Sequence, residues 1–313
     1  MTPAKGSETS PSDRGVLVAD LGGSQLRVAV FDGAGEIRHK TSVETPPGRP
    51  AALGGALSDA KSSVDLEVLG AVVGVPGPVD YQRGEVGRLP NLPAWEGRVS
   101  ARLLADTLGL PVILANDADL GALGEHRSGA GRGVADMVYL AVGTGVGAGV
   151  VTGGRLLHGR WSLAEAGHMV IDRASGGTVE ALGAGPALRR LTGEDAERVV
   201  MLAGEGDGQA LAAMAQVAEA LAIGLLNLLY CFMPQRAVIG GGLAQAGALL
   251  LDPIREQVAR RGAGLSLDAA EIVLGEHGSD AGLVGGGALG VDAFLAGAGS
   301  SALQITRPRV SPG

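Results

Sequence analysis

Two short segments of this chain share one plan, and this repeat limits the available folds more than any other feature. In residues 16–32 an apolar run ends at Asp20, a turn of Gly22, Gly23 and Ser24 follows, and a second apolar run leaves the turn. Residues 138–151 repeat the order, with a turn rich in glycine and threonine. Each segment predicts a buried strand, a tight turn and a returning strand. Two copies predict a duplicated fold whose hairpin tips face each other.

The turn composition indicates phosphate binding. Exposed backbone N–H groups and small hydroxyls suit phosphate oxygens. A Walker-type loop needs a lysine directly after its glycines, and the lysines Lys5, Lys40 and Lys61 all lie elsewhere. A dinucleotide fingerprint needs a helix after its glycines, whereas here the glycines lead into Val150 and Val151, which continue as a strand. The turns therefore belong to neither of these common nucleotide folds.

Strands and helices alternate along the rest of the chain, which predicts an α/β fold with two lobes and a cleft between them. We expect an N-terminal lobe over residues 15–117, joined by the last helix, residues 281–297, and a C-terminal lobe over residues 118–280. Residues 1–14 and 298–313 are expected to be disordered. The expected strands are residues 16–20, 27–31, 69–75, 112–115 and 237–240, besides the second hairpin. The expected helices are residues 51–63, 99–108, 118–126, 185–192, 194–203, 208–233, 247–261 and 281–295.

Composition excludes several classes of protein. A net charge of −8 over 313 residues argues against general nucleic-acid or membrane-surface binding. The single cysteine, Cys231, forbids an intrachain disulfide and predicts a cytoplasmic protein. The longest apolar stretch, residues 211–233, carries Gln216, Glu219 and Asn227, which favours a buried helix over a membrane span.

Three polar clusters could carry chemistry, and each has a structural alternative. Asp20 ends a strand, where a carboxylate can hold hydrated Mg²⁺ near a phosphate or can simply serve a turn. Asn116 and Asp117 also end a strand; an aspartate there can accept a proton from a substrate hydroxyl, and either residue can cap the following helix. The third cluster can bind sugar hydroxyls or form a solvated helix face. Its members are Glu165, His168 and Glu180.

Several motifs in order make the chain resemble the ROK family of the sugar kinase/Hsp70/actin superfamily. The motif Asp20-x-Gly-Gly-Ser-x-x-Arg27 resembles the first phosphate motif of that superfamily, and residues 143–147 resemble the second. Residues 74–80 and 90–95 resemble the sugar-side loops, and Asn116-Asp-Ala-Asp119 with Gly124-Glu125 resembles the catalytic segment. Glu165-x-Gly-His168 resembles the sugar-binding signature, and residues 239–242 resemble the adenosine-side loop.

The resemblance implies a two-lobed, actin-like and ribonuclease H-like fold and an ATP-dependent, glucokinase-like hexose kinase. Asp117 would be the general base. The sugar would be bound by Asn91, Asn116, Glu165, His168 and Glu180. ATP and Mg²⁺ would face Asp20, Gly22, Gly23, Ser24, Thr144 and Gly145, with Gly241 and Gly242 along the adenosine. Phosphoryl transfer depends mostly on positioning and charge stabilisation, which agrees with such a set of residues.

The chain departs from the family pattern at three places. The usual cysteine-rich zinc loop between the sugar-binding histidine and glutamate is replaced by residues 169–179, which contain no cysteine, so no structural zinc is expected. The segment 159–165 is one residue shorter and carries Trp161, and Asp119 stands where the family often has asparagine.

Two functions therefore stay open. The first is a sugar kinase acting on a glucose-like hexose or an N-acetylhexosamine. The second is a catalytically weak or inactive sugar sensor; since only about fourteen residues precede residue 16, no DNA-binding domain is expected. The expected partners are the sugar, ATP and further copies of the chain, in a homodimer or higher homo-oligomer, with neither nucleic acid nor a membrane.

Overall fold

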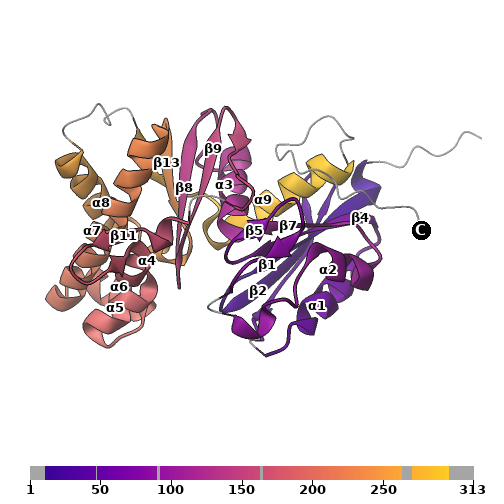
Figure 1. Ribbon diagram of the computed structural model, residues 1–313, viewed down its shortest axis with the longest axis horizontal. Helices are drawn as coiled ribbons and strands as arrows, with labels where there is room; N and C mark the ends of the chain where they lie inside the picture. The colour runs from indigo at the N-terminus through magenta and orange to yellow at the C-terminus, as the bar shows by residue number, and fades with distance from the viewer. Residues whose placement is uncertain (1–10, 47, 90–91, 163–164, 263–269, 296–313) are drawn as a thin grey trace, which may run out of the picture.

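The structure is a computed structural model that describes residues 11–46, 48–89, 92–162, 165–262 and 270–295. Two sheets with the same strand plan organise the chain into two lobes (Figure 1). The first sheet has the order β3-β2-β1-β4-β7 and the second has the order β10-β9-β8-β13-β14. In each, three antiparallel strands are followed by two that run parallel to the first strand of the hairpin. The predicted duplicated, two-lobed actin-like fold is confirmed.

The first sheet combines an antiparallel hairpin with parallel strands. The bounds of its strands are β1 (Arg14–Leu21), β2 (Gln25–Asp32), β3 (Ile37–Glu44), β4 (Glu67–Val75) and β7 (Val112–Asn116). The sequence did not predict β3. Its side chains are mostly exposed and polar because it is an edge strand, so the apolar alternation that identifies a buried strand is absent. Residues 11–14, expected to be disordered, form the 3-10 helix η1 (Pro11–Asp13) and the start of β1.

Helices cover both faces of the first sheet. Helices α1 (Ala51–Ser62) and α2 (Ala101–Leu108) pack on one face, where Leu53, Leu57 and Leu104 join the core of strand residues such as Leu17. Helix α9 (Ala281–Gly290) packs on the other, with Leu283 against side chains of β1 and β2. A single helix over residues 281–295 was expected. The structure instead continues α9 into a π-helical turn, Val291–Leu295.

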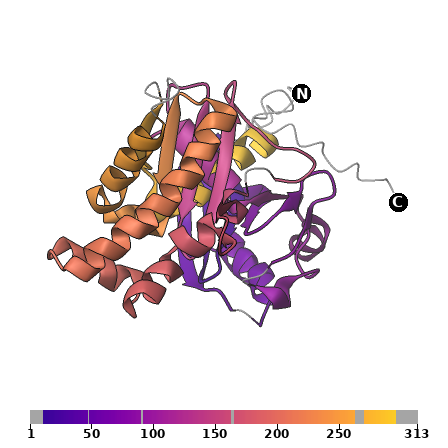
Figure 2. The ribbon, with the colours of Figure 1, turned by 60° about the vertical axis from the view of Figure 1, so that its left-hand side comes forward.

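The second sheet is covered in the same way. Its strands are β8 (Met137–Val142), β9 (Val146–Thr152), β10 (Arg155–Leu156), β13 (Arg236–Gly240) and β14 (Glu271–Leu274). Helix α3 (Asp117–Ser128) packs against β8 and β9 on the face toward the other lobe. The remaining helices lie on the far side (Figure 2). They are α4 (Val179–Gly183), α5 (Gly185–Thr192), α6 (Ala196–Gly204), α7 (Gly208–Phe232) and α8 (Ala248–Arg261).

Helix α7 is long and apolar enough, by length and composition, to cross a membrane. Most of its most apolar window, 61%, is buried inside the protein. Leu221, Leu225 and Leu229 are fully buried in the core of the second lobe. In this structure α7 is therefore a core helix, as the sequence predicted.

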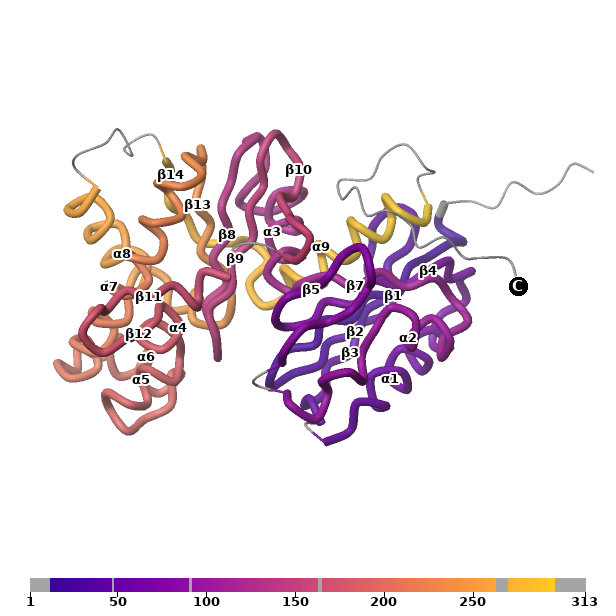
Figure 3. The backbone as a smooth tube through the Cα atoms, in the orientation of Figure 1, coloured from indigo at the N-terminus to yellow at the C-terminus, as the bar shows by residue number. Residues whose placement is uncertain are grey.

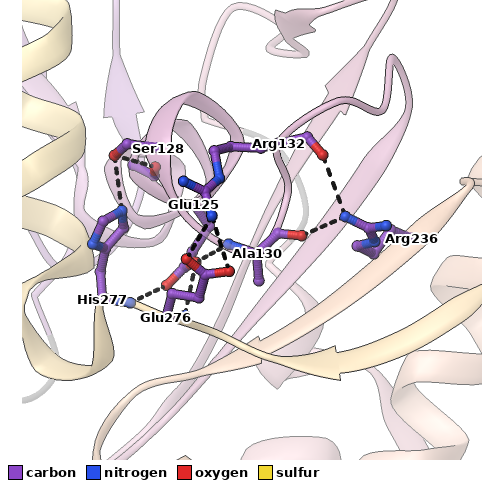
Figure 4. A network of polar contacts seen from close by, with 8 residues as sticks. Glu125, Ser128, Ala130, Arg132, Arg236, Glu276 and His277 are labelled. Atoms are coloured by element: carbon purple, nitrogen blue, oxygen red, sulfur yellow. Dashed lines mark hydrogen bonds and ion pairs between the residues drawn. The ribbon is translucent and has the colours of Figure 1, made fainter.

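Helices α3 and α9 pack against each other between the two lobes. The buried carboxylate of Glu125 lies beside this joint between the lobes. Glu125, on α3, is completely buried. Its Oε2 accepts from the N–H groups of Ala130 (2.9 Å) and Glu276 (3.0 Å), and its Oε1 accepts from the N–H of His277 (2.9 Å). Figure 4 shows this network, in which Ser128 Oγ also lies 2.9 Å from His277 Nε2. One side chain thus ties α3 to the segments that follow α3 and β14.

Candidate active site

The strand register brings the ends of three neighbouring strands to one edge of the first sheet. Asp20 of β1 pairs with Gly74 of β4, and Val75 of β4 pairs with Asn116 of β7. Because these strands are parallel, their carboxyl ends open on the same side, which is where α/β sheets bind ligands. Asp20 and the Asn116–Asp117 pair therefore lie at a common edge.

Asp20 is a buried carboxylate between β2 and the start of α9. It is 8% exposed, and Arg27 Nη1 lies 3.5 Å from its Oδ2. Burial raises the pKa of Asp20 to about 6 despite the opposing charge of Arg27. A Cβ placed on Gly282, in the first turn of α9, would lie 3.2 Å from this carboxylate, so only glycine leaves that space open.

Asn116 is the N-cap of α3. Its Oδ1 accepts from the N–H groups of Ala118 (3.0 Å) and Asp119 (3.1 Å), and its Nδ2 donates to the carbonyl of Gly77 at 3.0 Å. The capping alternative is thus confirmed for Asn116. One amide hydrogen of Nδ2 remains for a ligand.

Asp117, the first residue of α3, does not share the capping role of Asn116. Burial, together with the negative charges of Asp20 and Glu165, raises the pKa of Asp117 to about 7. A hydrogen bond from the Ala118 N–H, 2.8 Å from Oδ1, opposes this shift. The carboxylate therefore lies within electrostatic reach of both Asp20 and Glu165. A raised pKa near neutrality is the property that a general base needs.

Glu165 is the N-cap of the short 3-10 helix η3 (Ala166–His168), and His168 is its last residue. Glu165 Oε2 lies 3.9 Å from His168 Nε2, and the two side chains are 37% and 67% exposed. Burial raises the pKa of Glu165, and the charge of Glu180 adds to this effect while His168 opposes it. The two side chains are therefore near each other and accessible to a ligand.

Glu180 lies in the first turn of α4 and contacts the second glycine turn. Its Oε2 accepts from the backbone N–H of Val146 at 2.9 Å. A short hairpin, β11 (Val170–Asp172) and β12 (Gly177–Thr178), separates His168 from Glu180 and occupies the segment in which the sequence lacks cysteines. Among the residues described, no group of three or more His, Cys, Asp or Glu side chains could hold a metal ion.

The glycine turns are exposed at some positions, and at others their backbone conformation or close packing leaves room only for glycine. Gly22 N–H donates to the Gln25 carbonyl at 2.8 Å, and Gly23, Ser24 and Thr144 are exposed. Gly241 has φ +84°, and a Cβ there would lie 2.4 Å from the carbonyl oxygen of Val142. Gly242 has no atom within 4 Å of such a position. The loop after β13 thus lies directly beside the turn of the β8–β9 hairpin.

The structure therefore brings together most of the residues singled out from the sequence. The series Asp20, Asp117, Glu165 and Glu180 is linked by mutual electrostatic influence, and Glu180 reaches the turn that contains Thr144 and Gly145. Asn91 lies outside the described residues. Sequence reasoning missed the role of Tyr81, whose hydroxyl contacts Asp119, because a single tyrosine after a predicted loop carries no motif.

Comparison with known proteins identifies the group to which this fold and site belong. The family model described as "ROK family" matches residues 16–292. The chain belongs to the ROK family. The predicted family resemblance is therefore confirmed.

The relatives include enzymes and regulators. A glucokinase from Halalkalibacterium halodurans is 31% identical over 88% of this chain and 94% of its own length. The crystal structure of a ROK family glucokinase from Streptomyces griseus, in complex with glucose and AMPPNP, has a TM-score of 0.79 and 30% identity, covering 88% of this chain and 98% of that one. A xylose repressor from Caldicellulosiruptor bescii is 31% identical over 62% of this chain and 55% of its own length.

Proposed function

We propose that this protein is an ATP-dependent kinase that phosphorylates a hydroxyl group of a glucose-like hexose or an N-acetylhexosamine. One observation carries the proposal: the carboxylate of Asp117, at the start of α3, lies within electrostatic reach of both Asp20 and Glu165, and its pKa is raised to about 7. Family membership and the similarity to glucokinases over nearly the whole chain support it.

The sugar side of the proposed site is formed by the loops around α3 and η3. Glu165 and His168 present accessible hydrogen-bonding groups, Asn116 retains one amide hydrogen, and Glu180 retains acceptor capacity beyond its bond to Val146. Asn91 is proposed to join them. Sugar hydroxyls both donate and accept, so carboxylates, amides and an imidazole match them.

The phosphate side is formed by the two glycine turns. The turn of Gly22, Gly23 and Ser24 and the turn of Thr144 and Gly145 offer small hydroxyls and backbone N–H groups, except the N–H of Gly22, which is bonded to the Gln25 carbonyl. We assign Gly241 and Gly242 to the adenosine. Asp20 fits hydrated Mg²⁺, since it is a hard oxygen donor whose pKa of about 6 leaves it mostly ionised at neutral pH. The ion would neutralise phosphate charge.

Each group of residues has a distinct role in the proposed reaction. The sugar-side groups hold the acceptor hydroxyl beside Asp117, whose carboxylate takes the hydroxyl proton as the oxygen attacks the γ-phosphorus of ATP. The bond from this phosphorus to the bridging oxygen breaks, and ADP leaves with the electron pair. The glycine turns hold the phosphates in line with that oxygen, and the two lobes exclude water when they close. Asp117 ionises near pH 7, so it is a stronger base than an exposed aspartate.

A non-catalytic sugar sensor is the second candidate, because the chain also resembles a xylose repressor. An assay of ADP formation across glucose, mannose, fructose, allose and their N-acetylamino relatives separates the two. Turnover of at least one sugar supports the kinase. Sugar binding without any turnover supports the sensor.

Three further properties belong to this proposal. The protein is cytoplasmic, assembles as a homodimer or higher homo-oligomer, and holds no structural zinc because the β11–β12 hairpin fixes His168 and Glu180 instead. The hairpin turn is held by Asp172, whose Oδ1 accepts from Ala174 N–H at 2.9 Å. Metal analysis tests the last property: one tightly held zinc per chain contradicts it. Light scattering after size-exclusion chromatography tests the assembly.

A further inference from the structure

A second buried carboxylate lies close to Asp117 and has no role in the mechanism described so far. Asp119 is completely buried, and its Oδ1 is the one buried side-chain oxygen or nitrogen without a hydrogen-bond partner in the part of the chain that the structure describes. Leaving a buried polar atom unpaired is costly, so such groups call for an explanation.

The other oxygen of Asp119 belongs to a bridge that leads back to the catalytic segment. The hydroxyl of Tyr81 donates to Asp119 Oδ2 at 2.5 Å and accepts from the backbone N–H of Asn116 at 3.3 Å. Tyr81 is 5% exposed. Tyr81 therefore connects two points of the chain on either side of Asp117. One is the backbone N–H of Asn116, and the other is the side chain of Asp119, the third residue of α3.

Tyr81 is itself held from both lobes. It directly follows β5 (Val79–Asp80), the end of the proposed sugar-side segment 74–80 in the first lobe (Figure 3). Its ring meets the imidazole of His158, from the segment after β10, edge-on with centroids 5.1 Å apart and an angle of 61°. The hydroxyl position is therefore fixed by contacts with two parts of the chain far apart in sequence.

We propose that Tyr81 and Asp119 are positioning residues for the reaction, which hold the Asn116–Asp117 peptide so that the Asp117 carboxylate stays directed at the acceptor hydroxyl. The inference rests on the proposed kinase function. Neither side chain touches the reacting atoms in this account. A small displacement of a catalytic group costs rate rather than binding, so the pair should affect turnover more than sugar affinity.

The protonation state of Asp119 agrees with this role. Burial, together with the charges of Asp117 and Glu165, raises the pKa of Asp119 to about 8, although the hydrogen bond from Tyr81 opposes the shift. Burial and the charge of Asp119 also raise the pKa of Tyr81, so its hydroxyl keeps the proton that it donates. Asp117 therefore ionises before Asp119 as the pH rises, and near pH 7 Asp119 is mostly neutral. Above pH 8 a second charge appears beside Asp117, where anionic phosphates must approach.

The test compares Tyr81→Phe, Asp119→Leu and Asp119→Asn with the exposed control Tyr230→Phe on α7. Tyr81→Phe keeps the ring and removes both hydrogen bonds, so kcat should fall about 10- to 100-fold while the sugar KM stays within about threefold. Asp119→Asn keeps an acceptor for Tyr81 and cannot ionise. It should regain most of the kcat lost in Asp119→Leu. We expect the wild-type rate to decline above pH 8 as Asp119 ionises, and the rate of Asp119→Asn not to decline.

Three outcomes overturn the inference. Wild-type kcat in Tyr81→Phe excludes the positioning role, even if Asp119→Leu fails to fold. A loss confined to the sugar KM makes Tyr81 a binding residue instead. If the rate of Asp119→Asn declines above pH 8 as that of the wild type does, ionisation of Asp119 does not cause the decline and Asp119 has no part in the proposed role. If the wild type turns over no sugar, the proposed function fails and the inference fails with it, whereas an active wild type with an unaffected Tyr81→Phe defeats the inference alone.

Discussion

The carboxylate of Glu180 accepts a hydrogen bond from the backbone N–H of Val146, 2.9 Å from Oε2. Glu180 follows the sugar-side segment, and Val146 begins the strand after the second glycine turn. This bond joins the sugar side of the proposed site to the phosphate side without a metal ion.

Gly145→Ala tests that connection. The new Cβ would lie 2.5 Å from Glu180 Oε2, and this oxygen is the end of a flexible side chain, so the glutamate should move and release Val146. One charge-assisted hydrogen bond corresponds to about tenfold in affinity, and we expect the sugar KM to rise by about that factor while the fold survives. Gly55→Ala on α1, where a Cβ meets nothing within 4 Å, is the matched control. An unchanged sugar KM in Gly145→Ala would show that the bond plays no part in binding.

A strap formed by residues 157–162 crosses to the first lobe and lies on β5. Ser162 Oγ accepts from the Val79 N–H at 3.1 Å, and the N–H of Ser162 donates to the Val79 carbonyl at 2.9 Å. Arg160 Nε lies 3.2 Å from Asp80 Oδ2, with the arginine side chain 59% exposed. The Asp80 carboxylate is itself buried, but its Oδ1 also accepts from the N–H groups of Gln82 (3.1 Å) and Arg83 (3.0 Å), so it keeps partners without Arg160. Because the Arg160 side chain is mostly exposed, its ion pair contributes about 0–1 kcal/mol, whereas an unsatisfied buried N–H costs about 1–3 kcal/mol.

Ser162→Ala should therefore destabilise the protein more than Arg160→Ala does. It should also raise the sugar KM, because the strap leads directly into the segment before Glu165. Thermal unfolding and steady-state kinetics of the two variants provide the comparison. A larger effect from Arg160→Ala would mean that the ion pair, rather than the buried hydrogen bonds, holds the strap.

Glu125→Gln should destabilise the joint between the lobes. An amide group cannot accept all three N–H groups that the carboxylate accepts now, and one buried mismatch costs about 1–3 kcal/mol. The exposed Glu256→Gln on α8 is the control and should leave the unfolding free energy within about 0.5 kcal/mol. Denaturant unfolding measures both; equal stabilities would show that the network is dispensable.

The pKa of Asp117 makes both activity and stability depend on pH. The base must be ionised, so kcat/KM should fall about tenfold per pH unit below about pH 7. The folded-state pKa lies above the ordinary value of 3.8, so burial of the charge destabilises the fold progressively as the pH rises from about 4 to 7. Asp117→Asn should therefore be more stable than the wild type at pH 8 and gain nothing at pH 3. Melting temperatures at the two pH values check the sign.

The sequence predicted the parts of the fold that depend on local patterns. The two glycine hairpins, the helix starting near Asp117 and the long apolar helix all carry periodic apolar residues or turn residues, and the structure contains each of them. Edge strand β3 escaped prediction because solvent replaces one of its neighbours and removes the apolar signal. The pairing of α3 with one sheet and α9 with the other is a property of the tertiary packing that no local pattern contains.

The candidate site was predictable where a residue belongs to a motif and not where it acts through another residue. Asp20, Asn116 and Asp117 follow buried strands, which directs attention to the edge of the sheet. The contact between Tyr81 and Asp119 joins positions 38 apart in sequence. The environment that raises the pKa of Asp119 exists only once the lobes are packed. Such contacts depend on the tertiary structure and leave no signal in the local sequence.

The most direct test of the account measures turnover and sugar binding together for Asp117→Asn, with the sugar that the wild type phosphorylates fastest. Loss of a positioned general base typically costs about 10²–10⁴-fold in rate, while the hydrogen bonds that hold the sugar remain. We therefore predict that kcat falls by that factor and that the sugar Kd, measured by titration calorimetry, stays within about threefold. A variant that keeps a near-normal kcat would contradict the account, because Asp117 would then be a structural residue at the start of α3 and the site would work without it.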